Sequence, residues 1–229
     1  MSISPPDKFF KSACILCGAG CDGAFCSACQ MDMPYNRVSC PVCARSTITS
    51  HVCSSCLREP PNFHECLAMY VYQHPVDALI REMKFNQRPE IIHALGNDFA
   101  LWLSDRLDSQ PDVMIPVPMH RRRMMQRGYN QALELARTLS KQLSIPIDSH
   151  CCQRIRNTPS QTDIPTKQRK ANVQGAFEIP TPLNYRHVAI VDDVVTTGST
   201  VNEIAMLFTR AGVKYIHVYA LSRAGPDPV

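Results

Sequence analysis

The chain has 229 residues, a formal net charge of +4 and 12 cysteines. Its length leaves room for one ordinary domain of ~100–200 residues and a second, smaller one. No segment approaches the ~18 consecutive apolar residues that span a bilayer, and the opening MSISPPDKFFKSACILCG lacks the pattern of a secretory leader. We therefore expect a cytoplasmic protein without membrane insertion, whose cysteines serve as metal ligands rather than disulfides.

Most of the cysteines lie near the N-terminus. Eight of them form four CxxC pairs before residue 57, and each half of this segment holds two pairs separated by a short, turn-rich gap. The spacing indicates two zinc-ribbon-like sites in tandem. The simplest assignment gives one structural Zn²⁺ to each group of four: Cys14, Cys17, Cys26 and Cys29 in the first group, and Cys40, Cys43, Cys53 and Cys56 in the second.

Other arrangements of these thiols stay open. They include cross-pairing between the groups, a single metal site, a redox role and an iron–sulfur centre. Cys21 and His51 are further candidate ligands outside the simplest assignment. Cys66, Cys151 and Cys152 are expected to be ordinary buried thiols.

A Glu-Pro-Pro-Asn segment at residues 59–62 ends the cysteine-rich part of the chain. Its two prolines remove backbone donors and fix φ, so neither a helix nor a central strand continues through it. We place a domain boundary there. The prediction is a double zinc-ribbon domain at residues 1–58 and a second domain at residues 63–229.

Strands and helices alternate in the second domain. Alternation of this kind predicts parallel strands joined by crossover helices, hence an α/β fold with a parallel sheet flanked by helices. The short apolar runs AIV and IHV are typical of strands covered on both faces. The predicted strands are 67–72, 113–118, 187–192 and 214–221, and the predicted helices are 75–85, 90–107, 130–143 and 200–212.

Basic residues concentrate in two segments of this domain. The first, PMHRRRMMQRG (118–128), follows a predicted strand and is expected to be a loop. The second, at 154–170, contains two prolines and few apolar residues, and its part from 157 onward is expected to be a mobile loop. Both segments should attract anions, with a merely solvated basic surface as the alternative.

The segment HVAIVDDVVTTGST carries the clearest chemistry. Ligands of open parallel sheets bind beyond the carboxyl ends of strands, where Asp192 and Asp193 are expected. Residues 196–200 then supply backbone N–H groups, hydroxyls and a glycine at a helix start, a combination that suits a phosphate. Thr200 and Glu203 also fit a capping box, but this leaves the paired carboxylates unexplained. The spacings of a Walker loop and of a dinucleotide fingerprint are absent.

The same segment resembles the phosphoribosyl pyrophosphate (PRPP) motif of type I phosphoribosyltransferases. The resemblance implies that Asp192 and Asp193 hold the ribose 2′- and 3′-hydroxyls. It implies that the 5′-phosphate is enclosed by Thr196, Thr197, Gly198, Ser199 and Thr200.

A longer pattern is similar to the ComF/GntX family of competence-associated phosphoribosyltransferase-like proteins, which combine a double zinc ribbon with a type I phosphoribosyltransferase domain. The segments PVPMHRRRMMQRGYNQ and RIRNTPSQTDIPTKQRKANVQGAF carry this resemblance, behind the cysteine-rich part. Arg127, Gly128, Tyr129, Asn130 and Gln131 match an RGFNQ-type motif, with Tyr for Phe. Arg156, Thr158, Gln161, Arg169 and Asn172 match the family's second basic segment.

The resemblance also implies a function. The protein is expected to bind PRPP with Mg²⁺ and to transfer phosphoribose to an unidentified acceptor, in a process linked to DNA uptake and natural transformation. The alternative is a non-catalytic, PRPP-sensing adaptor that binds single-stranded DNA or competence or recombination proteins; retention of catalysis stays open. The pyrophosphate candidates are Arg127, which we favour because it adjoins Gly128, and Arg123, Arg156 and Arg169.

Overall fold

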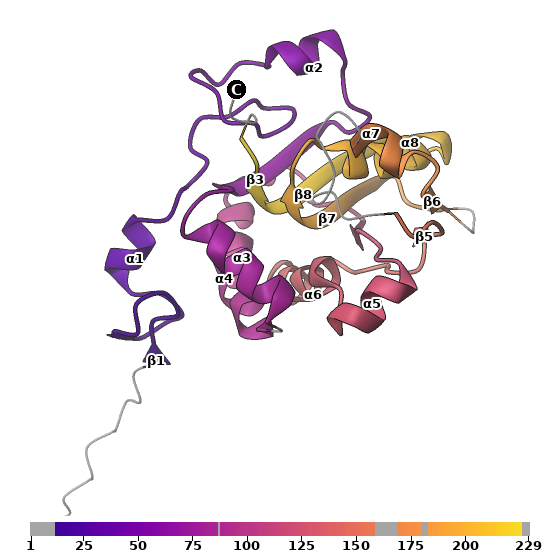
Figure 1. Ribbon diagram of the computed structural model, residues 1–229. Coiled ribbons are helices and arrows are strands. Elements are labelled where there is room, and N and C mark those ends of the chain that lie inside the picture. The colour runs from indigo at the N-terminus through magenta and orange to yellow at the C-terminus, as the bar shows by residue number, and fades with distance from the viewer. Residues whose placement is uncertain (1–11, 87, 159–168, 180–182, 226–229) are drawn as a thin grey trace, which may run out of the picture. The chain divides into compact units, whose positions relative to one another are not determined.

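The computed structural model describes residues 12–86, 88–158, 169–179 and 183–225 (Figure 1). The chain divides into two compact units, Met1–Met33 and Pro34–Val229. In the small unit, β1 (Ser12–Ala13) pairs antiparallel with β2 (Gly20–Cys21), and α1 (Ser27–Met31) follows. The four cysteines of the first group all belong to this unit.

The large unit contains a four-stranded sheet in which every pair of neighbours is parallel. The α/β fold with a parallel sheet is therefore confirmed. The apolar runs of the central strands are buried, as expected for strands covered on both faces. In spatial order the strands are β3 (Glu65–Val71), β8 (Tyr215–Arg223), β7 (His187–Val195) and β4 (Val113–Pro116).

Helices cover both faces of this sheet (Figure 1). One face carries α3 (Val76–Phe85), α4 (Pro89–Ser104) and α6 (Gln131–Leu143), and the other carries α7 (Arg169–Val173) and α8 (Ser199–Arg210). α6 and α8 each bury an apolar stripe at helical spacing, which is the pattern that predicted them. None of the helices in the described ranges is long and apolar enough to span a membrane.

The first basic segment is not the loop that we expected, because residues Arg121–Arg127 form the helix α5. Arginine, methionine and glutamine are good helix formers. The His120 side chain accepts from the Arg122 N–H at the start of the helix, and Gly128 ends it with φ of 83°. The arginines are thus displayed on a short, capped helix.

The second basic segment is bounded by a small ribbon, in which β5 (Gln153–Arg154) pairs antiparallel with β6 (Phe177–Glu178). The mobile loop predicted from residue 157 includes residues 159–168, which lie outside the described residues, as does Gln161. Residues 169–173 form α7 rather than loop.

The second cysteine group belongs to the large unit. Cys40, Cys43 and Cys56 are buried in the same apolar core as residues of β3 and α8, and the Cys66 N–H of β3 donates to the Val42 carbonyl at 2.9 Å. α2 (Ser54–Arg58) follows the third cysteine of this group. The compact units therefore divide after residue 33, whereas the domain boundary at residues 59–62 stays a prediction.

Candidate functional site

The paired carboxylates, Asp192 and Asp193, lie near the carboxyl end of β7. The Asp193 N–H donates to Asp192 Oδ1 at 2.9 Å, and the Val194 N–H donates to Asp193 Oδ1 at 2.8 Å. Asp193 is 8% exposed, and its Oδ2 lies 2.8 Å from Nζ of Lys84 on α3. Among the described residues, Lys84 is the cation that forms an ion pair with these two carboxyl groups.

The burial and closeness of the two carboxyl groups affect their protonation. Burial and the negative charge of Asp193 together raise the pKa of Asp192 to about 8, against the opposing effect of Lys84. Near neutral pH the pair therefore holds a proton. Hydroxyl donors or a divalent cation at these oxygens favour the ionised form and release that proton.

The segment after β7 turns directly into a helix. Gly198 adopts φ of 85° at the N-cap of α8, a left-handed conformation that favours glycine. The Thr197 and Ser199 hydroxyls lie 2.8 Å apart, and the Ser199 N–H donates to Thr197 Oγ1 at 3.3 Å. The segment thus places hydroxyls and first-turn N–H groups at the positive end of a 12-residue helix, where an anion is stabilised.

A cavity of about 390 Å³ connects these groups. It lies at the carboxyl ends of the strands, where ligands of open α/β sheets bind. Both aspartates line it, as do Arg123, Arg127 and the phosphate-loop candidates except Thr197; the loop residues at the cavity are Thr196, Gly198, Ser199 and Thr200. The structure thus brings together residues from β7, α8 and the first basic segment.

Two arginines in the cavity wall converge on Thr158. Arg123 Nη2 donates to the Thr158 carbonyl at 3.1 Å, and Arg154 donates to the Thr158 hydroxyl. Burial and the nearby charge of Arg123 together lower the pKa of Arg154 to about 10. Two like charges held beside each other favour an anion between them, and guanidinium groups suit phosphate oxygens.

The other arginine candidates differ in position. Arg127 Nη1 donates to Gln131 Oε1 at 3.3 Å within the cavity wall, and its guanidinium lies 5.7 Å from the centroid of the Phe85 ring. Arg156 does not line the cavity, because its Nη1 donates to the Gln174 carbonyl at 2.8 Å on an exposed surface. Arg169 begins α7, and its side chain lies outside the described part of the chain.

Sequence reasoning missed three basic residues of the cavity wall, Arg81, Lys84 and Arg154. Lys84 belongs to a different crossover helix, and no local pattern links it to the aspartates. Arg154 belongs to the second basic segment, but only its position in β5 directs its side chain toward the cavity instead of solvent.

Each group of four cysteines forms a cluster in which ligand sulfurs lie within 4.8 Å of one another. The sulfurs of Cys17 and Cys26, and those of Cys43 and Cys53, are 3.7 Å apart. Tetrahedral zinc with Zn–S bonds of about 2.3 Å separates its sulfurs by about 3.8 Å. The two clusters are therefore consistent with two structural zinc sites.

The two clusters share a local design. In each, the N–H of the third cysteine donates to the sulfur of the first, from Cys26 to Cys14 at 3.4 Å and from Cys53 to Cys40 at 3.3 Å. Burial opposes ionisation of both first cysteines, but N–H donors lower the pKa of Cys14 to about 6 and that of Cys40 to about 7. Thiolates are the form that binds metal. Cys21 and His51 belong to neither cluster.

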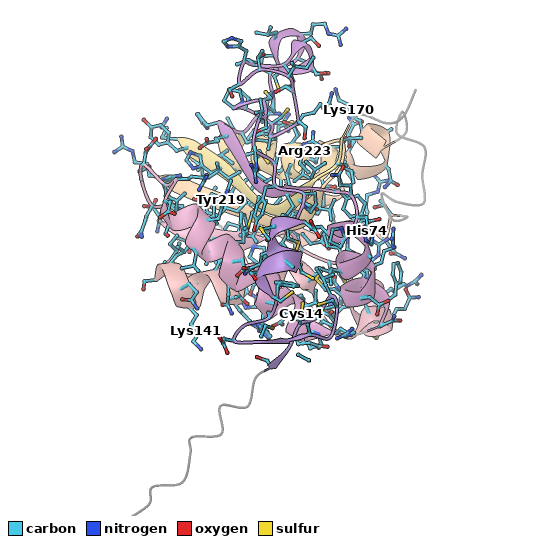
Figure 2. The ribbon with its side chains drawn as sticks, turned by 90° about the vertical axis from the view of Figure 1, so that its left-hand side faces the viewer. Cys14, His74, Lys141, Lys170, Tyr219 and Arg223 are labelled. Atoms are coloured by element: carbon cyan, nitrogen blue, oxygen red, sulfur yellow. The ribbon has the colours of Figure 1, made fainter. Side chains whose placement is uncertain are left out.

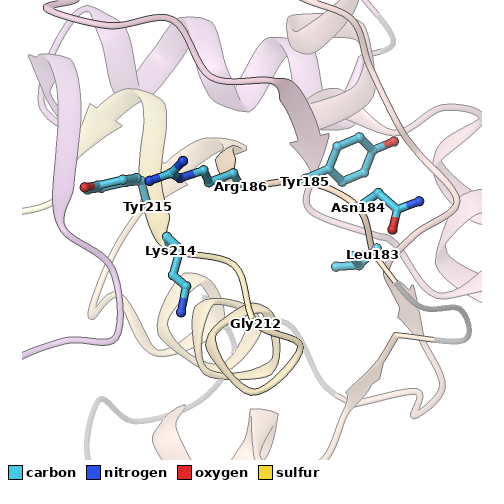
Figure 3. Close-up of a pocket in the computed structure, with 7 residues that line it drawn as sticks. All are labelled: Leu183, Asn184, Tyr185, Arg186, Gly212, Lys214 and Tyr215. Atoms are coloured by element: carbon cyan, nitrogen blue, oxygen red, sulfur yellow. The ribbon is translucent and has the colours of Figure 1, made fainter.

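A second hollow, of about 560 Å³, opens at the amino ends of the strands (Figure 3). Arg186, Lys214 and Tyr215 line it, at the starts of β7 and β8. It contains no carboxylate pair and no helix start. The phosphate-binding chemistry of the described residues is therefore concentrated in the first cavity.

Fold and cavity together define an α/β protein with a parallel sheet and a cavity suited to anions at the carboxyl ends of its strands. No protein-family model matches the chain, but full-length relatives do. The chain is 37% identical over 206 residues to DNA utilization protein YhgH of Escherichia coli (strain K12), covering 86% of this chain and 89% of that protein. It is 34% identical over 231 residues to Competence protein F of Haemophilus influenzae, covering 95% and 99%. The chain belongs to the family of these proteins, the ComF/GntX family.

More distant similarities were also found. Competence protein ComFC of Bacillus subtilis is 24% identical over 180 residues, covering 76% of this chain and 72% of that protein. Among solved structures, a glutamine PRPP amidotransferase of B. subtilis matches with 19% identity and a TM-score of 0.41, over 62% of this chain and 30% of that chain. A purine phosphoribosyltransferase of Pyrococcus horikoshii matches with 19% identity and a TM-score of 0.35, over 59% and 90%.

Proposed function

We propose that the protein binds PRPP with Mg²⁺ in the cavity at the carboxyl ends of the strands and transfers phosphoribose to an acceptor. The observation that supports this most directly is the composition of the cavity. It combines a carboxylate pair, a hydroxyl-rich helix start and a set of arginines within about 390 Å³. PRPP carries a matching diol, monophosphate and pyrophosphate.

Each part of the ligand has a partner in this proposal. Asp192 and Asp193 accept the ribose hydroxyls, and residues 196–200 at the start of α8 hold the 5′-phosphate. The pyrophosphate lies against Arg123, Arg127 and Arg154. Arg156 and Arg169 stay further candidates for pyrophosphate contacts.

The reaction proposed is a substitution at the anomeric carbon. The bond from that carbon to pyrophosphate breaks, pyrophosphate leaves with the electron pair, and a nucleophile of the acceptor forms the new bond and loses its proton. The arginines stabilise the charge on the departing pyrophosphate. Carboxylate oxygens and phosphates are the ligands that Mg²⁺ prefers, so this cavity fits the ion, which supplies further charge neutralisation when bound.

The cysteine clusters hold structural zinc in this proposal. Cys14, Cys17, Cys26 and Cys29 bind one ion, and Cys40, Cys43, Cys53 and Cys56 bind the other. The ions stabilise segments that contain few regular elements, because metal binding substitutes for an apolar core in small domains.

The acceptor and partners are proposed from the relatives. Those relatives are named for competence and for DNA utilization. We propose that this chain acts in DNA uptake. An adaptor that senses PRPP and binds single-stranded DNA or competence or recombination proteins is the second candidate, since the same names fit it.

Pyrophosphate release from PRPP separates the two candidates. We expect release that depends on an added acceptor, in the presence of Mg²⁺, and that disappears in Asp193→Asn. PRPP binding without release for any nucleobase, nucleoside or oligonucleotide acceptor tested would support the adaptor. DNA binding that is unaffected by loss of PRPP binding would also favour it.

A further inference from the structure

Arg223 lies at the end of β8 (Figure 2). It is a buried cation with an unusual set of partners. Its side chain is 2% exposed. None of the ion pairs among the described residues involves it. A guanidinium group without a carboxylate partner is costly to bury, so its hydrogen bonds and nearby charges must compensate.

The hydrogen bonds of Arg223 join two distant parts of the chain. Its Nε donates to the carbonyl of Cys43 at 2.8 Å. Its Nη1 donates to the carbonyl of Val195 at 2.9 Å and also to that of Thr196. Cys43 belongs to the second cysteine cluster, whereas Val195 and Thr196 lead into the phosphate loop at the start of α8. A single planar group therefore connects the cluster to the loop.

The cluster also supplies the charge that Arg223 lacks. Four thiolates around one divalent cation carry a net charge of about −2. A metal-loaded second cluster would therefore be an effective counter-charge for the guanidinium group.

We propose that the second cysteine cluster controls the phosphate loop through Arg223, so that loss of its metal weakens phosphate binding. The role of the loop as a 5′-phosphate site rests on the proposed function. Arg223 is a positioning residue in this scheme, because it contacts loop carbonyls and not the cavity. The first cluster belongs to the small unit.

Linkage makes the effect reciprocal. If the metal increases the affinity for PRPP by a certain factor, PRPP increases the retention of that metal by the same factor. The inference can therefore be tested by measuring either the affinity for PRPP or the retention of the metal.

Cys26 and Cys53 provide a matched pair of variants, since both are third cysteines that precede a short helix. We expect Cys53→Ser to increase hydrogen exchange at the amides of residues 196–200 and to weaken Mg²⁺–PRPP binding at least tenfold. Cys26→Ser should change neither. Arg223→Met should reproduce both effects while both zinc ions stay bound, and Arg223→Lys should restore part of the affinity.

A second measurement covers the case in which Cys53→Ser does not fold. Cys26→Ser retains only the second cluster, so release of its zinc to a chromogenic chelator reports on that cluster alone. Mg²⁺–PRPP should slow this release, and Arg223→Met should abolish the slowing. Loop exchange equal in Cys53→Ser and Cys26→Ser, or zinc release unaffected by bound PRPP, would overturn the inference. Absence of PRPP binding by the wild type would instead overturn the proposed function, and the loop exchange would still test the connection.

Discussion

Binding of Mg²⁺–PRPP should release a proton from Asp192. In the free protein, burial and the neighbouring Asp193 hold the pKa of this carboxyl at about 8. At pH 7 a group with that pKa is about 90% protonated, so ionisation on binding releases about 0.9 proton per chain. The ionised form is the one that accepts ribose hydroxyls or faces a cation.

The sign of the pH dependence follows directly. Because the free protein binds one more proton than the complex below pH 8, the affinity should increase with pH by up to about tenfold per unit between pH 6 and 8, and then level off. Calorimetric titrations in buffers of different ionisation enthalpy give the proton count, with titration of the ligand alone as the control for its own phosphates. No proton release at pH 7, or affinity that decreases from pH 6 to 8, would refute the assignment of Asp192.

Four further outcomes are expected. Arg154→Met should weaken pyrophosphate binding about tenfold or more, through loss of charge-assisted hydrogen bonds worth ~1.5–3 kcal/mol, whereas Arg156→Met, outside the cavity, should leave it unchanged. Gly198→Ala should cost about 1 kcal/mol of unfolding free energy, because the left-handed φ of 85° penalises a Cβ that meets nothing closer than 3.9 Å; an unchanged denaturant midpoint would contradict this. Lys84→Met should lower the unfolding free energy by about 3 kcal/mol, since it leaves Asp193 without its cation, and adding Asp193→Asn should recover much of the loss. Elemental analysis should find zinc at both clusters, and a purified wild type with fewer than about one zinc per chain would reject both sites.

The sheet and its helices could be predicted because their signals are local. The apolar run before Asp192 identifies a strand covered on both faces, and the stripes of α6 and α8 repeat at helical spacing. The fold then places the end of β7 at the ligand-binding edge without further information. The motif and its position were therefore readable from the chain alone.

The helix α5 was missed for a local reason. A run of arginines between a strand and a helix suggested a loop. The caps at both ends of this run instead stabilise a helix. His120 and Gly128 complete a short helix of residues that individually favour one. Histidine is not among the residues that usually indicate the N-cap of a helix in a sequence.

The rest of the site depends on contacts between distant segments. Lys84 reaches Asp193 from another crossover helix, and Arg223 joins Cys43 to Val195. No periodicity or residue spacing in the sequence links Lys84 to Asp193, or Arg223 to Cys43 and Val195. The CxxC pairs predicted two clusters, but not that the second one packs into the core of the sheet while the first one belongs to a separate unit.

Calorimetric titration of Mg²⁺–PRPP into the zinc-loaded wild type and into the Asp192→Asn, Asp193→Asn double variant tests the central claim most directly. Both substitutions preserve the size of the side chains and remove only the carboxylate charges. The account predicts one PRPP bound per wild-type chain and no measurable binding to the double variant, with circular dichroism confirming that both are folded. Equal affinities for the two proteins would contradict it.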